Sequence, residues 1–173
     1  MNSQSEMVTV VQGEFAVSHN PATVFSTILG SCVSVCLYDQ SHRVGGMNHF
    51  LLAMSQGNGG SDLKYGVNAM ELLINRLIKE GASRFNLEAK VFGGARMTAH
   101  ARDIGASNAA FALEFLDREG IPVRAQSVGG DRARRVQFVP TTGAARQIRF
   151  DGKISEVATR PQQQAPASNV TLF

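Results

Sequence analysis

The chain has 173 residues, of which 43% are hydrophobic and 18% charged, with a formal charge of +3 and two cysteines. This composition is typical of a soluble globular protein with one well-buried core, so a single domain is expected. It offers no run near the roughly 20 apolar residues of a membrane span, and its polar residues 1–6 do not resemble a signal peptide. We therefore expect a cytoplasmic protein without membrane insertion, with both cysteines reduced.

Basic residues are concentrated in one part of the chain. Between Ile121 and Phe150, six arginines stand against one aspartate, which suits an acidic protein surface or nucleic acid. Charges that protect a strand edge explain the pattern equally well. Because no zinc-finger, helix-turn-helix or RNA-stacking motif accompanies the arginines, no nucleic-acid partner is expected.

The first half of the chain is predicted to be rich in strands. Turn residues separate four apolar or β-branched runs, at residues 7–11, 14–18, 27–39 and 44–54. The last two runs flank the polar segment 39–43 and predict two antiparallel strands joined by a tight turn. The first two predict a kinked strand or a small hairpin.

The second half alternates helices with strands. A stripe at helical spacing predicts a helix that ends before Gly81, with Val67, Met70, Ile74, Leu77 and Ile78 on its buried face. A strand over 85–92 follows, then a second helix from Asp103 or Ser107 to Glu119, then strands at 123–128, 135–139 and 144–150. The sequence therefore predicts a single α/β domain over 1–152, an α+β sandwich of mixed, largely antiparallel sheets with two main helices, and a disordered tail over 153–173.

A cysteine and a histidine are predicted to meet on the hairpin. If its turn centres between Gln40 and Ser41, Cys32 lies directly opposite His49, with the Cβ atoms about 5 Å apart. At that separation an imidazole can take the thiol proton, so the pair suggests a cysteine nucleophile with its base. A thiol beside an imidazole is expected to ionise at a lower pH than a free thiol.

The residues around Cys32 fit this chemistry. Gly30 and Ser31 precede it, where a tight turn can leave backbone N–H groups of Gly30, Ser31 and Cys32 free to bind an oxyanion. Cys36 lies deeper in the apolar run and is expected to pack in the core. Side chains that could orient the imidazole are Ser26, Thr27, Ser31 and Asn48.

Zinc bound by Cys32, Cys36, His42 and His49 is the rival interpretation. An extended strand would hold Cys32 and Cys36 about 13 Å apart, too far for ligands of one ion. We therefore expect no metal at these residues.

Five segments together resemble the CheD family of chemoreceptor glutamine deamidases. They occur in the family's order, at residues 29–37, 46–50, 88–95, 104–108 and 129–136. The resemblance implies a compact α/β fold and hydrolysis of selected glutamine side-chain amides to glutamate on methyl-accepting chemotaxis receptors, by a cysteine–histidine–hydroxyl triad. The nucleophile then falls on Cys32 and the base on His49. The hydroxyl falls on Ser26 by register, or on Thr27 if the register shifts by one residue.

The resemblance also implies partners. These are the helical cytoplasmic domains of the receptors and a CheC-type phosphatase. Arg132, Arg134 and Arg135 are expected to form a basic rim that docks a glutamate-rich helix. Two other functions stay open: a non-catalytic adaptor that binds receptor or phosphatase, and a papain-like thiol hydrolase that cleaves peptide bonds.

Overall fold

The computed structural model describes residues 4–52, 59–98, 103–151 and 170–173. It contains two α-helices, one 3₁₀ turn and ten strands within these ranges. In chain order they are β1 (Glu6–Thr9), β2 (Phe15–Ser18), β3 (Thr23–Leu29), β4 (Val33–Asp39), β5 (Val44–Asn48), α1 (Gly59–Lys79), η1 (Arg84–Asn86), β6 (Glu88–Gly93), α2 (Ile104–Arg118), β7 (Val123–Val128), β8 (Ala133–Phe138), β9 (Ala145–Phe150) and β10 (Val170–Leu172).

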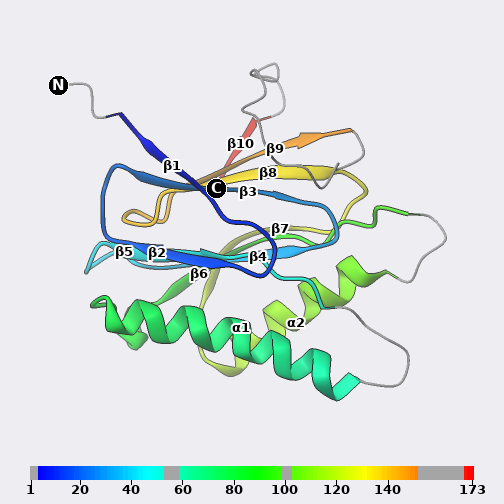
Figure 1. Ribbon diagram of the computed structural model, residues 1–173, viewed down its shortest axis with the longest axis horizontal. Coiled ribbons are helices and arrows are strands. Elements are labelled where there is room, and N and C mark those ends of the chain that lie inside the picture. The colour runs from blue at the N-terminus through cyan, green and yellow to red at the C-terminus, as the bar shows by residue number, and fades with distance from the viewer. Residues whose placement is uncertain (1–3, 53–58, 99–102, 152–169) are drawn as a thin grey trace.

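The strands form two five-stranded sheets that pack face to face (Figure 1). The outer sheet has the order β1-β3-β8-β9-β10, and the central sheet has the order β2-β5-β4-β6-β7. Neighbouring strands are antiparallel except for the pairs β1–β3 and β6–β7. Both helices cover the free face of the central sheet. The predicted α+β sandwich of mixed, largely antiparallel sheets with two helices is therefore confirmed.

Strand β4 lies at the centre of the molecule, and all seven of its residues are buried. Val33, Val35 and Leu37 face the helices, whereas Cys36 and Tyr38 face the outer sheet. Because both faces of the strand are covered, its sequence is apolar without alternation. Full burial of each such aliphatic side chain contributes about 1.5–3 kcal/mol.

The helices bury one face each against the central sheet. In α1 the buried stripe is Met70, Leu73, Ile74 and Leu77, while the predicted members Val67 and Ile78 are 36% and 41% exposed. The stripe is narrower than predicted because α1 lies on the surface and covers the sheet with one face only. Helix α2 begins after Asp103, whose carboxylate accepts a hydrogen bond from the amide of Ala106 at 3.0 Å.

The hairpin register differs from the prediction by two residues. Asp39 pairs with Val44, not with His42, so a four-residue loop joins β4 to β5. The buried Asp39 carboxylate holds this loop by accepting hydrogen bonds from the amide and Nδ1 of His42, at 3.1 and 2.6 Å. Arg43 closes it at a φ of +52°. The hydrogen bonds of this one aspartate thus favour a longer loop than the tight turn that the sequence suggested.

Two smaller predictions change. The strand predicted over 85–92 begins only at Glu88, because Arg84–Asn86 form a 3₁₀ turn. The predicted disordered tail ends in a strand, β10, which pairs with β9, and Phe173 packs edge-on against Phe92 with ring centroids 5.3 Å apart. The preceding part of the tail, 152–169, lies outside the described residues. Neither α-helix of the described ranges is long and apolar enough to cross a membrane.

Candidate active site

The cysteine turn, Gly30–Cys32, joins β3 of the outer sheet to β4 of the central sheet. All three of its carbonyl oxygens accept hydrogen bonds from the segments behind it: Gly30 from the amide of Ala95 at 2.9 Å, Ser31 from Nδ2 of Asn108 at 2.8 Å and Cys32 from the amide of Gly94 at 2.8 Å. The backbone N–H groups of Ser31 and Cys32, by contrast, donate to no carbonyl of the described residues. The turn therefore has its carbonyl acceptors used, while these two N–H groups bind no carbonyl of the described ranges and that of Cys32 lies against its own thiol.

Gly93 allows this close packing. It has a φ of +110°, and a Cβ atom at this position would lie 2.2 Å from the carbonyl oxygen of Cys32. A side chain here would push the turn away from β6. The Gly93-Gly94 pair thus supports the cysteine turn.

His49 is 7% exposed and lies between the sheets, directly after β5. Its Nδ1 is 2.8 Å from Oγ1 of Thr27 and 3.2 Å from the carbonyl oxygen of Val10. The Thr27 hydroxyl donates to the same carbonyl at 2.6 Å. Since this hydroxyl proton is committed to Val10, Oγ1 of Thr27 accepts from Nδ1, which must carry the imidazole proton. Nε2 is then unprotonated and able to accept a proton.

The hydroxyl beside the imidazole belongs to Thr27 and not to Ser26. Along β3 the buried positions alternate, and Thr27 is one of those that face the central sheet, whereas Ser26 is half-buried on the opposite face. The choice of Ser26 by register does not fit this geometry. Ser26 is selected when the chain is aligned with the family without a gap before the turn, and a shift of one residue selects Thr27 instead.

Cys32 and His49 share the space between the sheets but are not directly opposed. Val33 pairs with Phe50, which places Cys32 across from Leu51. A two-residue change in register preserves the face, so the two side chains are diagonal neighbours instead of a direct pair. The half-exposed Cys32 thiol donates its hydrogen bond to Oε1 of Gln12, at 3.6 Å.

Burial controls the protonation of both groups. It raises the pKa of the Cys32 thiol to about 11, against a smaller lowering by a backbone hydrogen bond. Burial also lowers the pKa of His49, which the hydrogen bond to Val10 partly offsets. At neutral pH the pair is therefore a neutral thiol and a neutral imidazole. Burial thus raises the pKa of the cysteine, whereas the sequence suggested a lowered one, so the thiolate would form by proton transfer to His49.

An open hollow of about 510 Å³ is lined by Arg96, Met97, Thr98, Gly130 and Asp131. Its lining begins one residue after Ala95, whose amide binds the Gly30 carbonyl of the cysteine turn at 2.9 Å. The amide of Arg96 binds the Gly130 carbonyl across the hollow's lining at 2.8 Å.

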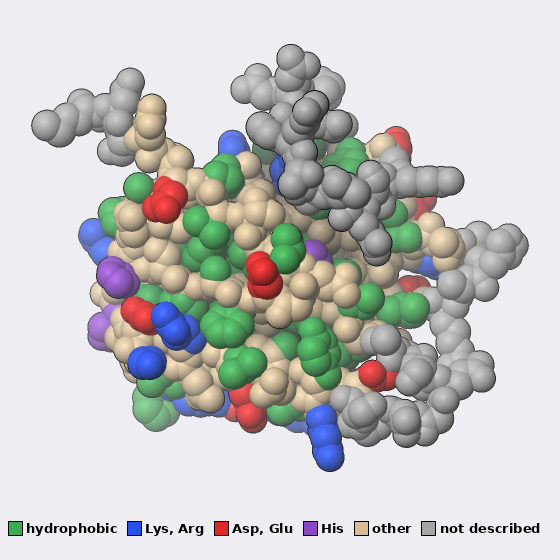
Figure 2. All heavy atoms as spheres, viewed as in Figure 1, with side chains coloured by type: hydrophobic (Ala, Val, Ile, Leu, Met, Phe, Trp, Pro, Cys, Tyr) green, Lys and Arg blue, Asp and Glu red, His purple; other side chains and the backbone are tan. Residues whose placement is uncertain are grey.

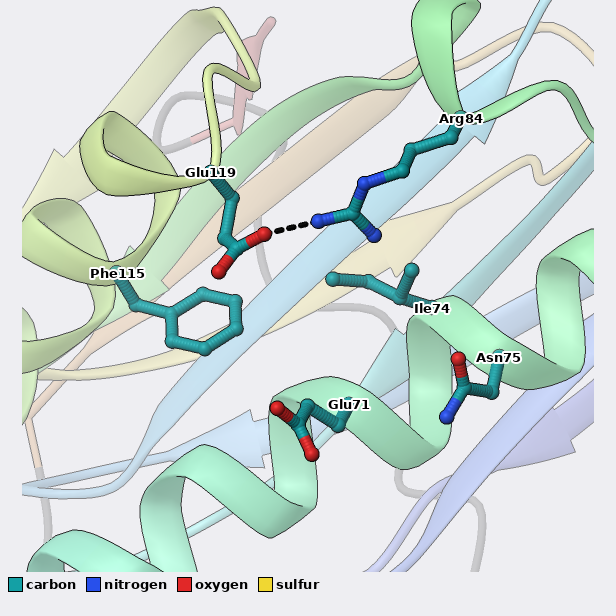
Figure 3. Close-up of a pocket in the computed structure, with 6 residues that line it drawn as sticks. All are labelled: Glu71, Ile74, Asn75, Arg84, Phe115 and Glu119. Atoms are coloured by element: carbon teal, nitrogen blue, oxygen red, sulfur yellow. Dashed lines mark hydrogen bonds and ion pairs between the residues drawn. The ribbon is translucent and has the colours of Figure 1, made fainter.

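A second cavity, of about 250 Å³, lies between the two helices (Figure 3). Ile74 and Phe115 form its apolar part, and Arg84 and Glu119 form an ion pair across it. It is on the helical face of the central sheet, whereas Cys32 and His49 lie toward the outer sheet. This cavity is therefore separate from the candidate active site.

The three arginines of the predicted basic rim do not lie together. Arg134 is 1% exposed, and its guanidinium donates to the carbonyl oxygens of Ser127 and Gly129 between the sheets. Arg135 is half-buried at the next position of β8, which faces the opposite side of the outer sheet. Only Arg132 is exposed, in an ion pair with Asp151. Basic and acidic side chains are interspersed on the face shown in Figure 2. A rim that includes Arg134 is therefore wrong.

The zinc interpretation finds no support in the side-chain positions. Cys36 is buried in the core between the sheets, and His42 lies in the hairpin loop against Asp39. Within the ranges described above, no three His, Cys, Asp or Glu side chains are grouped so as to hold a metal ion.

Comparison with known proteins places the chain in a family. A sequence profile described as "CheD chemotactic sensory transduction" matches residues 51–149. The chain belongs to the CheD family. It is 54% identical to "Probable chemoreceptor glutamine deamidase CheD 1" of Ruegeria sp. (strain TM1040), over 96% of this chain and 95% of that protein. It is 48% identical to "Probable chemoreceptor glutamine deamidase CheD" of Rhizobium meliloti (strain 1021), over the full length of both.

Among solved structures, this CheD-family chain is similar to Neisseria meningitidis protein NMB0706 (family-model DUF152). The TM-score is 0.48 at 10% identity, over 73% of this chain and 64% of that chain.

Asn108 contacts the cysteine turn, and the sequence assigned it no role. It is fully buried in α2, donates from Nδ2 to the Ser31 carbonyl and accepts from the amide of Leu52 at 2.9 Å. One side chain thus connects the cysteine turn to the segment that follows His49. Asn108 stood within the quoted segment 104–108, and a buried amide on an otherwise apolar helix face was the available signal.

Replacing Asn108 with alanine should therefore impair both stability and activity. The Ser31 carbonyl and the Leu52 amide would lose their partners, at a cost of about 1–3 kcal/mol in the free energy of unfolding. Urea unfolding measures this cost, and the turnover of a receptor fragment measures the activity. Ser107→Ala is the matched control, because its hydroxyl binds only the Asp103 carbonyl. Equal results for the two variants would show that Asn108 does not hold the site.

Thiol labelling tests the protonation state of this CheD-family site. Because burial raises the pKa of Cys32 to about 11, the rate of iodoacetamide labelling should still rise about tenfold per pH unit up to about pH 9.5. Cys36, with a pKa raised by burial to about 12, should stay unlabelled in the folded protein. A labelling rate that levels off near neutral pH would instead indicate a preformed thiolate–imidazolium pair.

Proposed function

We propose that this chain is a protein-glutamine deamidase that converts glutamine side chains of methyl-accepting chemotaxis receptors to glutamate. The observation that carries the proposal is the hydrogen-bond network of His49, Thr27 and Val10, set next to a cysteine turn with two N–H groups that bind no carbonyl of the described residues. The names of the relatives agree with this chemistry. The proposed nucleophile is Cys32, the base is His49 and the hydroxyl is that of Thr27.

The reaction proceeds through a thioester. Nε2 of His49 takes the thiol proton of Cys32 as Sγ attacks the carboxamide carbon of the substrate. The N–H groups of the Gly30–Cys32 turn, chiefly those of Ser31 and Cys32, stabilise the oxyanion. The imidazolium then protonates the leaving group, ammonia departs, and water hydrolyses the thioester with His49 again as base. No step requires a metal or an organic cofactor.

Thr27 acts through His49 in this scheme. Its hydroxyl oxygen accepts a hydrogen bond from Nδ1–H, so Nε2 remains the basic atom on the side of the cysteine. The Val10 carbonyl is a second acceptor for Nδ1. The Thr27 hydroxyl and the Val10 carbonyl are both neutral, so they stabilise the imidazolium less than a carboxylate would. The imidazolium therefore gives up its proton readily, as protonation of the departing ammonia requires.

The receptor would approach over the hollow lined by Arg96 and Gly130. Its exposed glutamine must reach Sγ of Cys32, which Oε1 of Gln12 contacts in the free protein, while the helix that carries it lies along the hollow. Arg132, the exposed member of the predicted rim, would meet a glutamate of that helix. A CheC-type phosphatase that bound here would compete with the receptor.

Peptide masses test the proposal directly. The protein is incubated with a cytoplasmic receptor fragment, and the digest is analysed for amide-to-acid conversion at glutamines. Conversion supports the deamidase. Cleavage of the fragment would indicate a papain-like hydrolase instead, and binding without any change of mass would indicate an adaptor.

A further inference from the structure

A glutamine of the chain itself lies at the reactive thiol. Oε1 of Gln12 is 3.6 Å from Sγ of Cys32, and Gln12 is exposed at the surface. Because the carboxamide carbon is bonded to Oε1 at about 1.2 Å, it lies within about 4.8 Å of the sulfur. Rotation about the Cα–Cβ and Cβ–Cγ bonds of this exposed side chain moves the carbon and can bring it closer to the attack distance of about 3–3.5 Å.

The loop that carries Gln12 is fixed to the base. Residues Val11–Glu14 form a turn closed by a hydrogen bond from the amide of Glu14 to the carbonyl of Val11, with Gly13 at a φ of +89°. The Gly13 amide donates to the His49 carbonyl at 2.8 Å, and the His49 amide donates to the Glu14 carbonyl at 3.1 Å. The loop that orients the imidazole through Val10 therefore also presents a carboxamide to the nucleophile.

We propose that Gln12 is a self-deamidation site, at which Cys32 converts the chain's own glutamine to glutamate. The inference rests on the proposed function, because it uses the same nucleophile and base. The carboxamide of Gln12 is the functional group that the receptor presents, and it occupies the place that the receptor glutamine must take. Gln12 is thus both the first substrate of the site and a competitor of the receptor.

The atoms balance with water as the only co-reactant. Sγ of Cys32 forms a bond to Cδ of Gln12, the C–N bond breaks, and the amide nitrogen leaves as ammonia with the thiol proton. Water then adds to the thioester, which releases the Cys32 thiol and leaves a side-chain carboxylic acid in place of the carboxamide. No oxidant or reductant is involved.

The test is a peptide map of the purified full-length protein over time at neutral pH. The fraction of residue 12 present as glutamate should increase with incubation, at least about a hundredfold faster than in Cys32→Ala. Gln40 is the internal control, because it is also exposed but lies in the β4–β5 loop. It should remain an amide. An intramolecular reaction also predicts that the rate constant does not change when the protein is diluted.

Receptor fragment added to the same samples separates this inference from the proposed function. Conversion of both the receptor and Gln12 supports the inference, and saturating fragment should slow conversion at residue 12. Conversion of the receptor while Gln12 keeps its amide would overturn self-deamidation and leave the deamidase intact. Failure of both conversions would overturn the deamidase and the inference with it. If Gln12 and Gln40 were converted equally, or if Gln12 were converted equally in the parent protein and in Cys32→Ala, Cys32 would play no part.

Discussion

Replacing Cys32 with alanine should abolish deamidation of the receptor fragment, while replacing Cys36 with alanine should not. Cys32 supplies the sulfur that forms the thioester, so turnover should fall by about 10⁴-fold or more. Cys36 is fully buried between the sheets and touches no group of the proposed reaction. Its loss leaves a small cavity that costs about 1 kcal/mol of stability.

The two cysteine variants must be compared at equal folded fraction. Cys32 is half exposed at the end of a turn that is held by its backbone carbonyls, so the alanine variant should melt near the parent temperature. Thermal unfolding checks this, and single-turnover peptide mapping measures the chemistry. Retained activity in Cys32→Ala, or loss confined to Cys36→Ala, would refute the assignment of the nucleophile.

Replacing Thr27 with valine should reduce turnover by about 10²-fold, while Ser26→Ala should leave it unchanged. Valine keeps the shape of the side chain but removes the acceptor for Nδ1 of His49. The Val10 carbonyl still lies 3.2 Å from Nδ1 and preserves the tautomer, so the loss should be smaller than the roughly 10⁴-fold effect of a wrong tautomer.

The pH profile separates orientation from general destabilisation. Without the Thr27 hydroxyl, the imidazolium loses a partner and the pKa of His49 should decrease further, which shifts the acidic limb of the turnover profile to lower pH. Thr27→Ser should restore most of the activity because it returns the hydroxyl. If Ser26→Ala is the more damaging change, the hydroxyl role belongs to Ser26 after all.

The sequence predicted the layers of the fold better than the contacts between them. Periodicity located both helices and most strands, since these patterns arise from burial of one face or two. It could not predict the length of the β4–β5 loop, because that length depends on the buried carboxylate of Asp39, which also accepts from the amide of Ser83 at 2.8 Å. The same error of two residues moved His49 from a direct to a diagonal position relative to Cys32.

The polar contacts around the imidazole could not be predicted from local sequence patterns. Val10 and His49 directly follow β1 and β5, Thr27 lies within β3, and Asn108 comes from a helix more than fifty positions later in the chain. Only their tertiary packing makes Val10, an ordinary apolar residue, the acceptor for two site hydrogens. The protonation states depended on the same packing, because burial outweighs the proximity effects that sequence spacing suggests.

Thr27 belongs to one sheet, His49 adjoins the other, and Cys32 sits where the chain crosses between them. The three proposed site residues thus lie on both sides of an interface that is filled by side chains, and no strand of one sheet pairs with a strand of the other in the part of the chain that the structure describes. A small shift of one sheet against the other could leave every strand paired with its neighbours and still separate the nucleophile from its proposed base.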